Sequence, residues 1–150
     1  MDWYTLGMRW IYIIALNILL LQPAVFAGEI TLIIEGQHIR ATLSSTPQSR
    51  QKGLMNQKRL CKNCGVLFVF PKTGKYKFWM KDTPLPLSIA FIAADGTILE
   101  LEEMQANTST IHSAHENILY ALEMHKGWFA EHSVKINEIV QGLQNAPLGE

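Results

Sequence analysis

The chain has 150 residues, 48% of them hydrophobic, and its 13 Lys and Arg residues balance 13 Asp and Glu residues, so the formal net charge is zero. A chain of this length usually forms one domain around a single hydrophobic core. Because affinity for nucleic acids comes mainly from neutralising phosphates, a neutral chain argues against a nucleic-acid partner.

The first residues have the pattern of an export signal. Arg9 precedes an apolar run at residues 10–21, and small residues lead up to Ala27. An uncleaved membrane anchor is the alternative, but Asn17 interrupts the run, which is shorter than the roughly 20 residues needed to span a bilayer. We therefore expect a signal peptide at residues 1–27, cleaved near Ala27, and a periplasmic or secreted protein with no stable membrane span.

The remaining domain, residues 28–150, has apolar residues that alternate mostly with period two, which indicates a mainly β protein. The first two expected strands form a hairpin around Glu35-Gly36-Gln37, and Ala94-Asp95-Gly96 is a second turn signal. The expected strands span residues 29–34, 38–43, 65–70, 75–81, 85–93, 97–104 and 118–125.

Two helices are expected between these strands. Thr46-Pro47 provides a cap followed by a proline at the first helical position, which predicts a surface helix over residues 48–59. A shorter helix is expected over residues 126–132, where Trp128 and Phe129 would close an end of the sheet. Residues 107–117 are expected to form a loop, and residues 144–150 a frayed tail. The predicted fold is a single small, mainly β domain with a sandwich or barrel-like sheet and two short helices.

The segment 75–84 is the best candidate for a site. If it is extended, alternate side chains point to opposite faces. One face is apolar and should join the core: Tyr76, Phe78 and Met80. The other sets an indole ring among ammonium groups: Lys75, Lys77, Trp79 and Lys81. Lysines that protect an edge strand from pairing explain the charges but explain Trp79 less well, whereas contact with a ligand also explains the indole ring.

The pair Cys61-Lys62-Asn63-Cys64 allows three interpretations. A small-loop disulfide that joins the end of the helix to the next strand is the simplest, and its short loop should contribute only about 1 to 2 kcal/mol. A redox pair would need a helix N-terminus or a cationic neighbour to lower the pKa of one thiol. A zinc site would add His112 and His115 to the two cysteines. Attachment of haem would require histidine in place of Gly65.

No arrangement of residues predicts a hydrolase. Candidate nucleophiles and bases are scattered, and no nucleophile-elbow motif is present. Asp82 and Glu123 could act as a pair of carboxylates. If Glu123 is buried in the expected strand 118–125, it needs a cationic partner, for which Arg50 and Lys81 are the candidates.

Several blocks of the chain together resemble the family called domain of unknown function 192. The blocks are Arg50, 53–55, 65–70, 78–83, 86–87, 89–91, 122–123 and 127–128. The resemblance implies a small, mainly β domain with a closed or sandwich-like sheet, often exported from bacteria, and it implies no activity. The chain departs from the pattern at Val66, at Asp82 and at Asn137-Glu138, and the Cys-x-x-Cys insert is particular to a subset.

The leading hypothesis is a binding or accessory module for a small polar or saccharide-like ligand or an envelope component. The expected ligand-binding residues are Arg50, Trp79, Lys81, Asp82 and Glu123. Two alternatives remain, namely a metal or redox protein that uses Cys61 and Cys64, and an enzyme that acts on envelope polymers through its carboxylates. The sequence assigns no catalytic residue and no cofactor.

Overall fold

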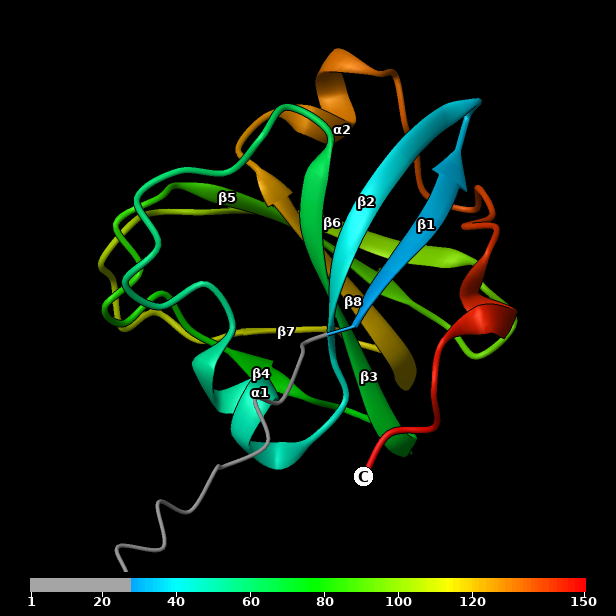
Figure 1. The fold of residues 1–150 in the computed structure, drawn as a ribbon, viewed down its shortest axis with the longest axis horizontal. Helices are drawn as coiled ribbons and strands as arrows, with labels where there is room; N and C mark the ends of the chain where they lie inside the picture. The colour runs from blue at the N-terminus through cyan, green and yellow to red at the C-terminus, as the bar shows by residue number, and fades with distance from the viewer. Residues whose placement is uncertain (1–27) are drawn as a thin grey trace, which may run out of the picture.

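A computed structural model describes residues 28–150, so the predicted signal peptide lies outside the described residues. The chain forms one six-stranded sheet in the order β1-β2-β3-β8-β5-β6 and a separate two-stranded sheet of β4 and β7 (Figure 1). Strands β2 and β3 are parallel, and every other pair is antiparallel. The strands are β1 (Glu29–Ile34), β2 (Gln37–Ser44), β3 (Cys64–Gly74), β4 (Lys77–Phe78), β5 (Leu87–Ile92), β6 (Ile98–Met104), β7 (His112–Ser113) and β8 (Ile118–His125).

In the described part of the chain, three short helices accompany the sheets: α1 (Pro47–Lys52), α2 (Trp128–Glu131) and the 3₁₀ helix η1 (Leu143–Asn145). In Figure 1, α2 lies near the top of the domain and α1 near the bottom, beside β4. Within residues 28–150, no helix has the length and apolar character that crossing a bilayer requires.

The segment 137–141 connects the two edges of the six-stranded sheet. At one edge, Ile33 of β1 and Gln141 exchange backbone hydrogen bonds of 3.1 and 2.9 Å. At the other edge, the Ile98 N–H donates to the Glu138 carbonyl at 2.9 Å, and Thr97 bridges to Ile139. Because the same segment pairs with both edges, the sheet is closed at this point and is barrel-like.

The two faces of the sheet are buried in two hydrophobic clusters. The first lies between the sheet and the C-terminal part of the chain, and its members there include Trp128, Phe129, Val140 and Leu143. The second includes Phe68, Phe91 and Ala121 from the sheet and is covered by Leu54, Phe78 and Met80. Burial of both faces explains why β5 is buried along its whole length and is apolar at every position except Ser88, instead of alternating.

The prediction of a small, mainly β domain with a barrel-like sheet and two short α-helices is confirmed, but several boundaries were wrong. Helix α1 ends at Lys52 and not at residue 59, because Gly53 takes φ +42° and breaks the helical geometry. The predicted strand 75–81 is reduced to β4, and the loop 107–117 contains β7.

The predicted frayed tail is also wrong. The end of the chain runs down past β1 to the lower end of β3 (Figure 1). There the Glu150 N–H donates to the Ser45 carbonyl at 2.8 Å, and Gly149 lies against the Phe70 backbone so closely that a Cβ would clash. Contacts to the N-terminal half of the chain hold the tail, and these could not be read from its own polar sequence.

Candidate functional site

A pocket of about 240 Å³ lies where α1 and the turn after it face β3, β4 and β8. It combines cationic, aromatic and polar side chains around a single carboxyl group. The lining residues are Arg50, Gln51, Lys52, Gly53, Leu54, Met55, Phe68, Phe70, Lys77, Phe78, Trp79, Thr83 and Glu123.

Glu123 is the only acidic residue that lines this pocket. It lies on β8 in the middle of the sheet, directly opposite Val66 on β3 and Ile89 on β5, and is 5% exposed. Burial raises the pKa of Glu123 to about 8, because the ionised form loses its hydration among apolar neighbours. The carboxyl group is therefore mostly protonated at neutral pH, when it can donate a hydrogen bond as well as accept one.

The expected ion pair of Glu123 with Arg50 or Lys81 is not formed. The ion pairs among residues 28–150 join other side chains. Arg50 directs its guanidinium to backbone oxygens instead: Nη1 donates to the Ser45 carbonyl at 2.6 Å and to the Val69 carbonyl at 2.9 Å. Protonation of Glu123 removes the need for a buried counter-charge, which is the physical reason that the prediction failed.

Arg50 also contacts the end of the chain and an aromatic ring. Its Nη2 donates to the Glu150 backbone oxygen, and its Cζ lies 5.5 Å from the centroid of the Phe70 ring. These contacts fix α1 against β3 and the tail, so Arg50 forms a rigid wall of the pocket.

Trp79 lies at the mouth of the pocket and is 46% exposed, whereas Phe78 and Met80 beside it are buried. The expected alternation of faces in this segment is therefore present, with Tyr76 only partly buried and stacked on Phe70. Lys81 Nζ lies 5.5 Å from the centroid of the Trp79 ring, within the range of a cation–π interaction.

Lys81 and Asp82 do not line the pocket. Asp82 takes φ +53° in a turn, and its carbonyl accepts a 2.8 Å hydrogen bond from the Asn56 N–H. This bond joins the turn after β4 to the turn after α1, on which Leu54 and Met55 approach the pocket. The structure thus brings Arg50, Trp79 and Glu123 together and leaves Asp82 in a supporting position.

Sequence reasoning missed Thr83, Phe68 and Lys52 as pocket residues. Thr83 is buried, and its hydroxyl donates to the Lys81 carbonyl at 3.1 Å. Thr83 and Phe68 both lie inside blocks that carry the family resemblance, which was the available signal. Lys52 had no such signal, because its position at the pocket depends on α1 ending at this residue, which the sequence did not predict.

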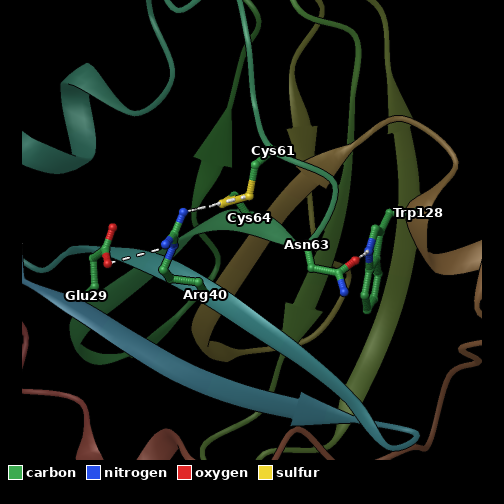
Figure 2. The surroundings of a disulfide bond; sticks show 6 residues. All are labelled: Glu29, Arg40, Cys61, Asn63, Cys64 and Trp128. Carbon is green, nitrogen blue, oxygen red and sulfur yellow. Dashed lines mark hydrogen bonds and ion pairs between the residues drawn. A yellow bond between two sulfur atoms is a disulfide. The ribbon is translucent and has the colours of Figure 1, made fainter.

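The second candidate site is the Cys61–Cys64 pair, which forms a disulfide at the start of β3 (Figure 2). Between the two cysteines, the Asn63 side-chain oxygen accepts a 3.2 Å hydrogen bond from Trp128 Nε1, and the Asn63 carbonyl accepts one of 2.9 Å from the Arg40 N–H. The disulfide interpretation of the sequence is confirmed.

The alternative zinc site is not formed. His112 and His115 each approach a glutamate, with Nδ1 at 2.7 Å from Glu102 and Glu100 respectively. In the part of the chain that the structure describes, no three His, Cys, Asp or Glu side chains are grouped so that they could hold a metal ion.

A comparison with protein families matches residues 30–142 to the DUF192 model, described as Uncharacterized ACR. The chain belongs to the DUF192 family. The match includes every residue of the pocket and the disulfide, so both sites lie within the DUF192 domain, and the resemblance noted in the sequence is confirmed. No curated protein matches the chain.

Two solved structures have the fold of this DUF192 domain. A protein from Sinorhizobium meliloti 1021, provisionally named a transcription regulator, has 30% sequence identity and a TM-score of 0.72, over 76% of this chain and 92% of its own. A protein of unknown function from Novosphingobium aromaticivorans DSM 12444 has 24% identity and a TM-score of 0.75, over 80% of this chain and 89% of its own. Both neighbours are covered almost completely, so they are small single-domain folds of the same kind.

Proposed function

We propose that this DUF192 domain is an exported binding module for a small polar ligand of the saccharide class, held in the pocket between α1, β3, β4 and Glu123. The observation that supports it most is Glu123, an uncharged carboxyl group that lines a pocket whose mouth carries the exposed ring of Trp79. The leader expected at residues 1–27 supports export.

The chemistry of the lining suits a sugar ring. A protonated carboxyl group can both donate to and accept from sugar hydroxyls, and an exposed indole offers an apolar face on which a pyranose ring can stack. The volume of about 240 Å³ lies below the roughly 300 to 1,000 Å³ of sites for drug-sized ligands, so the ligand is expected to be about the size of one ring.

The charges at the pocket favour a ligand that carries an anionic group. Lys52, Lys77 and Arg50 line the pocket, and the only carboxyl group there, on Glu123, is mostly neutral at pH 7. The site therefore has an excess of positive charge, and a hexuronic acid should bind more tightly than the corresponding neutral hexose.

The arrangement favours binding over the carboxylate-dependent enzyme considered from the sequence. Two-carboxylate chemistry on glycosides requires both groups to face one cavity, whereas Asp82 does not line the pocket that contains Glu123. A nucleic-acid role, which the name of the Sinorhizobium meliloti neighbour suggests, is disfavoured by the formal net charge of zero.

Titration of the protein with a hexuronic acid and with its neutral hexose, followed by NMR, tests the proposal. We expect chemical-shift changes at the Trp79 indole and at Thr83, with little change at the buried Trp128. Trp79→Ala should weaken binding roughly tenfold, because loss of the stacking contact costs about 1.5 kcal/mol. Raising the pH through 8 should also weaken binding of the uronic acid, because ionised Glu123 repels the anion.

Ile136→Ala is the matched control, because Ile136 is an exposed apolar side chain outside the pocket lining. The proposal would be contradicted by chemical-shift changes that are spread over the surface and are as large in Trp79→Ala as in the wild type. The absence of any chemical-shift change at millimolar sugar would also contradict it.

A further inference from the structure

The geometry around Cys61–Cys64 points to a redox-active disulfide: we propose that it exchanges with the dithiol of a partner protein, that Cys61 is the sulfur attacked, and that Arg40 stabilises Cys64 as the leaving thiolate. The proposal does not depend on the ligand-binding pocket. The disulfide is accessible and has a cationic side chain on one side. The backbone around it has a conformation that the oxidised and the reduced chain can both adopt.

The cationic neighbour lies closer to one sulfur than to the other. Arg40 Nη2 lies 3.4 Å from Cys64 Sγ and 4.0 Å from Cys61 Sγ (Figure 2). Cys61 is exposed and Cys64 is partly buried. An incoming thiolate therefore reaches Cys61 more easily, while the charge that develops on Cys64 is next to a guanidinium group. A positive neighbour lowers the pKa of a thiol, and a leaving thiol of lower pKa departs faster.

The surface around the disulfide leaves room for a polypeptide. Cys61 borders two hollows, of about 420 Å³ and about 360 Å³. The larger one is also lined by Leu43, Leu54 and Leu60, together with polar and charged side chains. An extended segment that carries a cysteine could lie there with its thiolate directed at Cys61, which a small thiol would not require.

The backbone around the disulfide is held by contacts that do not involve sulfur. The Cys64 N–H donates to the Cys61 carbonyl at 3.0 Å, and Asn63 is bonded to the Arg40 backbone and to the Trp128 indole. Because the closed loop is short, the disulfide adds little to the stability of the fold. The reduced chain should therefore keep its structure, which reversible exchange requires.

The exchange proceeds in two balanced steps. A partner thiolate attacks Cys61 Sγ, a mixed disulfide forms, the Cys61–Cys64 bond breaks, and its electron pair leaves with Cys64. The second thiolate of the partner then attacks the partner sulfur of the mixed disulfide and releases Cys61 as a thiolate, and Cys61 and Cys64 take up through water the two protons that the partner dithiol loses. The chain gains two electrons as a dithiol, and the partner dithiol loses two as it becomes a disulfide.

Glu29 moderates the effect of Arg40. Its Oε2 lies 3.8 Å from Arg40 Nε, and both side chains are largely exposed. Removal of this carboxylate should leave the guanidinium more strongly positive toward Cys64. The two substitutions Arg40→Gln and Glu29→Gln should therefore change the pKa of the Cys64 thiol in opposite directions.

The test measures the pKa of the Cys64 thiol in the Cys61→Ser protein by thiolate absorbance, and the rate of its alkylation by iodoacetamide. We expect a pKa below the ordinary value of about 8.5. Arg40→Gln should raise it and slow alkylation near neutral pH roughly threefold to tenfold, while Glu29→Gln should speed alkylation. Arg59→Gln is the matched control, because it removes the same charge from the larger hollow without a contact to sulfur.

A second measurement follows the reduction of the intact disulfide by reduced thioredoxin and by glutathione at equal thiol concentration. We expect faster reduction by thioredoxin and a severalfold slower reaction in Arg40→Gln. A Cys64 pKa near 8.5, equal rates in Arg40→Gln and Arg59→Gln, or faster reduction by glutathione would overturn the proposal. Circular dichroism of the reduced wild-type chain checks the shared backbone, and loss of the β spectrum on reduction would also overturn it.

Discussion

Glu123 illustrates how burial changes the chemistry of one residue. On a strand at the surface it would be an ordinary carboxylate, but here it lies between Val66 and Ile89 in the centre of the sheet. No cation pairs with it among the described residues, so desolvation raises its pKa to about 8. A group of this kind costs stability whenever it must ionise, and its retention at a pocket is consistent with a role in binding.

The raised pKa of Glu123 predicts a specific dependence of stability on pH. Between pH 4.5 and 8 the folded state keeps the proton and the unfolded state has lost it, so the free energy of unfolding falls as the pH rises. The fall should total about 5 kcal/mol. The contribution of Glu123 to the free energy of unfolding is fully present below pH 4.5 and is lost as the pH rises through about 8. Glu123→Gln should remove most of this slope, as measured by urea denaturation at a series of pH values, and should leave the smaller part due to His115, whose pKa is raised by Glu100.

Glu131→Gln is the control for this measurement, because Glu131 is exposed and should leave the slope as it is in the wild type. A Glu123→Gln protein whose stability still falls by the same amount over this pH range would show that another group is responsible.

At the scale of elements, the contact between β3 and β8 positions Glu123 and depends on a residue without a side chain. Gly65 on β3 lies opposite Met124, and a Cβ at this position would lie 2.5 Å from Met124 Sδ and 2.6 Å from the Glu123 carbonyl oxygen. Only glycine permits this close approach, which explains why a glycine precedes the apolar run 66–70 in a central strand.

Gly65→Ala should therefore destabilise the domain by about 1 to 3 kcal/mol, because the two strands must separate to admit the methyl group. Thermal unfolding measures this as a lower midpoint. Gly74→Ala on the same strand is the matched control, since its new Cβ would meet the Tyr76 ring at ordinary contact distances of 3.4 Å and more. Equal midpoints for the two variants would show that β3 and β8 can relax without cost.

At the scale of the whole molecule, the segment 137–141 makes the sheet barrel-like, because it pairs with both edges of what would otherwise be an open twisted sheet. Gly142 follows it with φ +96° and lies against β1, where a Cβ would be 2.6 Å from the Thr31 carbonyl oxygen. Both the backbone conformation and the space at this position require glycine. The closure protects the edges β1 and β6 from pairing with other chains.

Gly142→Ala should detach this segment from β1, in addition to causing backbone strain of about 1 to 2 kcal/mol. Hydrogen exchange should then be faster at the amides of Ile33 and Gln141, which pair with each other across the closure. Gly36→Ala is the matched control, because it has φ +73° with no neighbouring atom within 4 Å and so imposes strain without a clash. Unchanged protection of Ile33 in Gly142→Ala would contradict this role of the segment.

The sequence alone determined the features that depend on local patterns. Period-two alternation predicted most strands, the Thr46-Pro47 cap located the start of α1, and the spacing of Cys61 and Cys64 indicated their disulfide. The family blocks also contained Arg50, Trp79 and Glu123, which the fold brings to one pocket. These predictions succeeded because hydrophobic periodicity, capping and short-loop closure are set by residues close together in the chain.

Only the tertiary structure decided what each of these residues does. It directed Arg50 to backbone oxygens, left Glu123 without a counter-charge, placed Asp82 outside the pocket and joined the sheet edges through residues 137–141. Each outcome depends on contacts between segments far apart in the sequence, and on the desolvation that follows from them. The periodicity of a single strand carries no information about which distant group will lie opposite a side chain, or whether a charge there will keep its water.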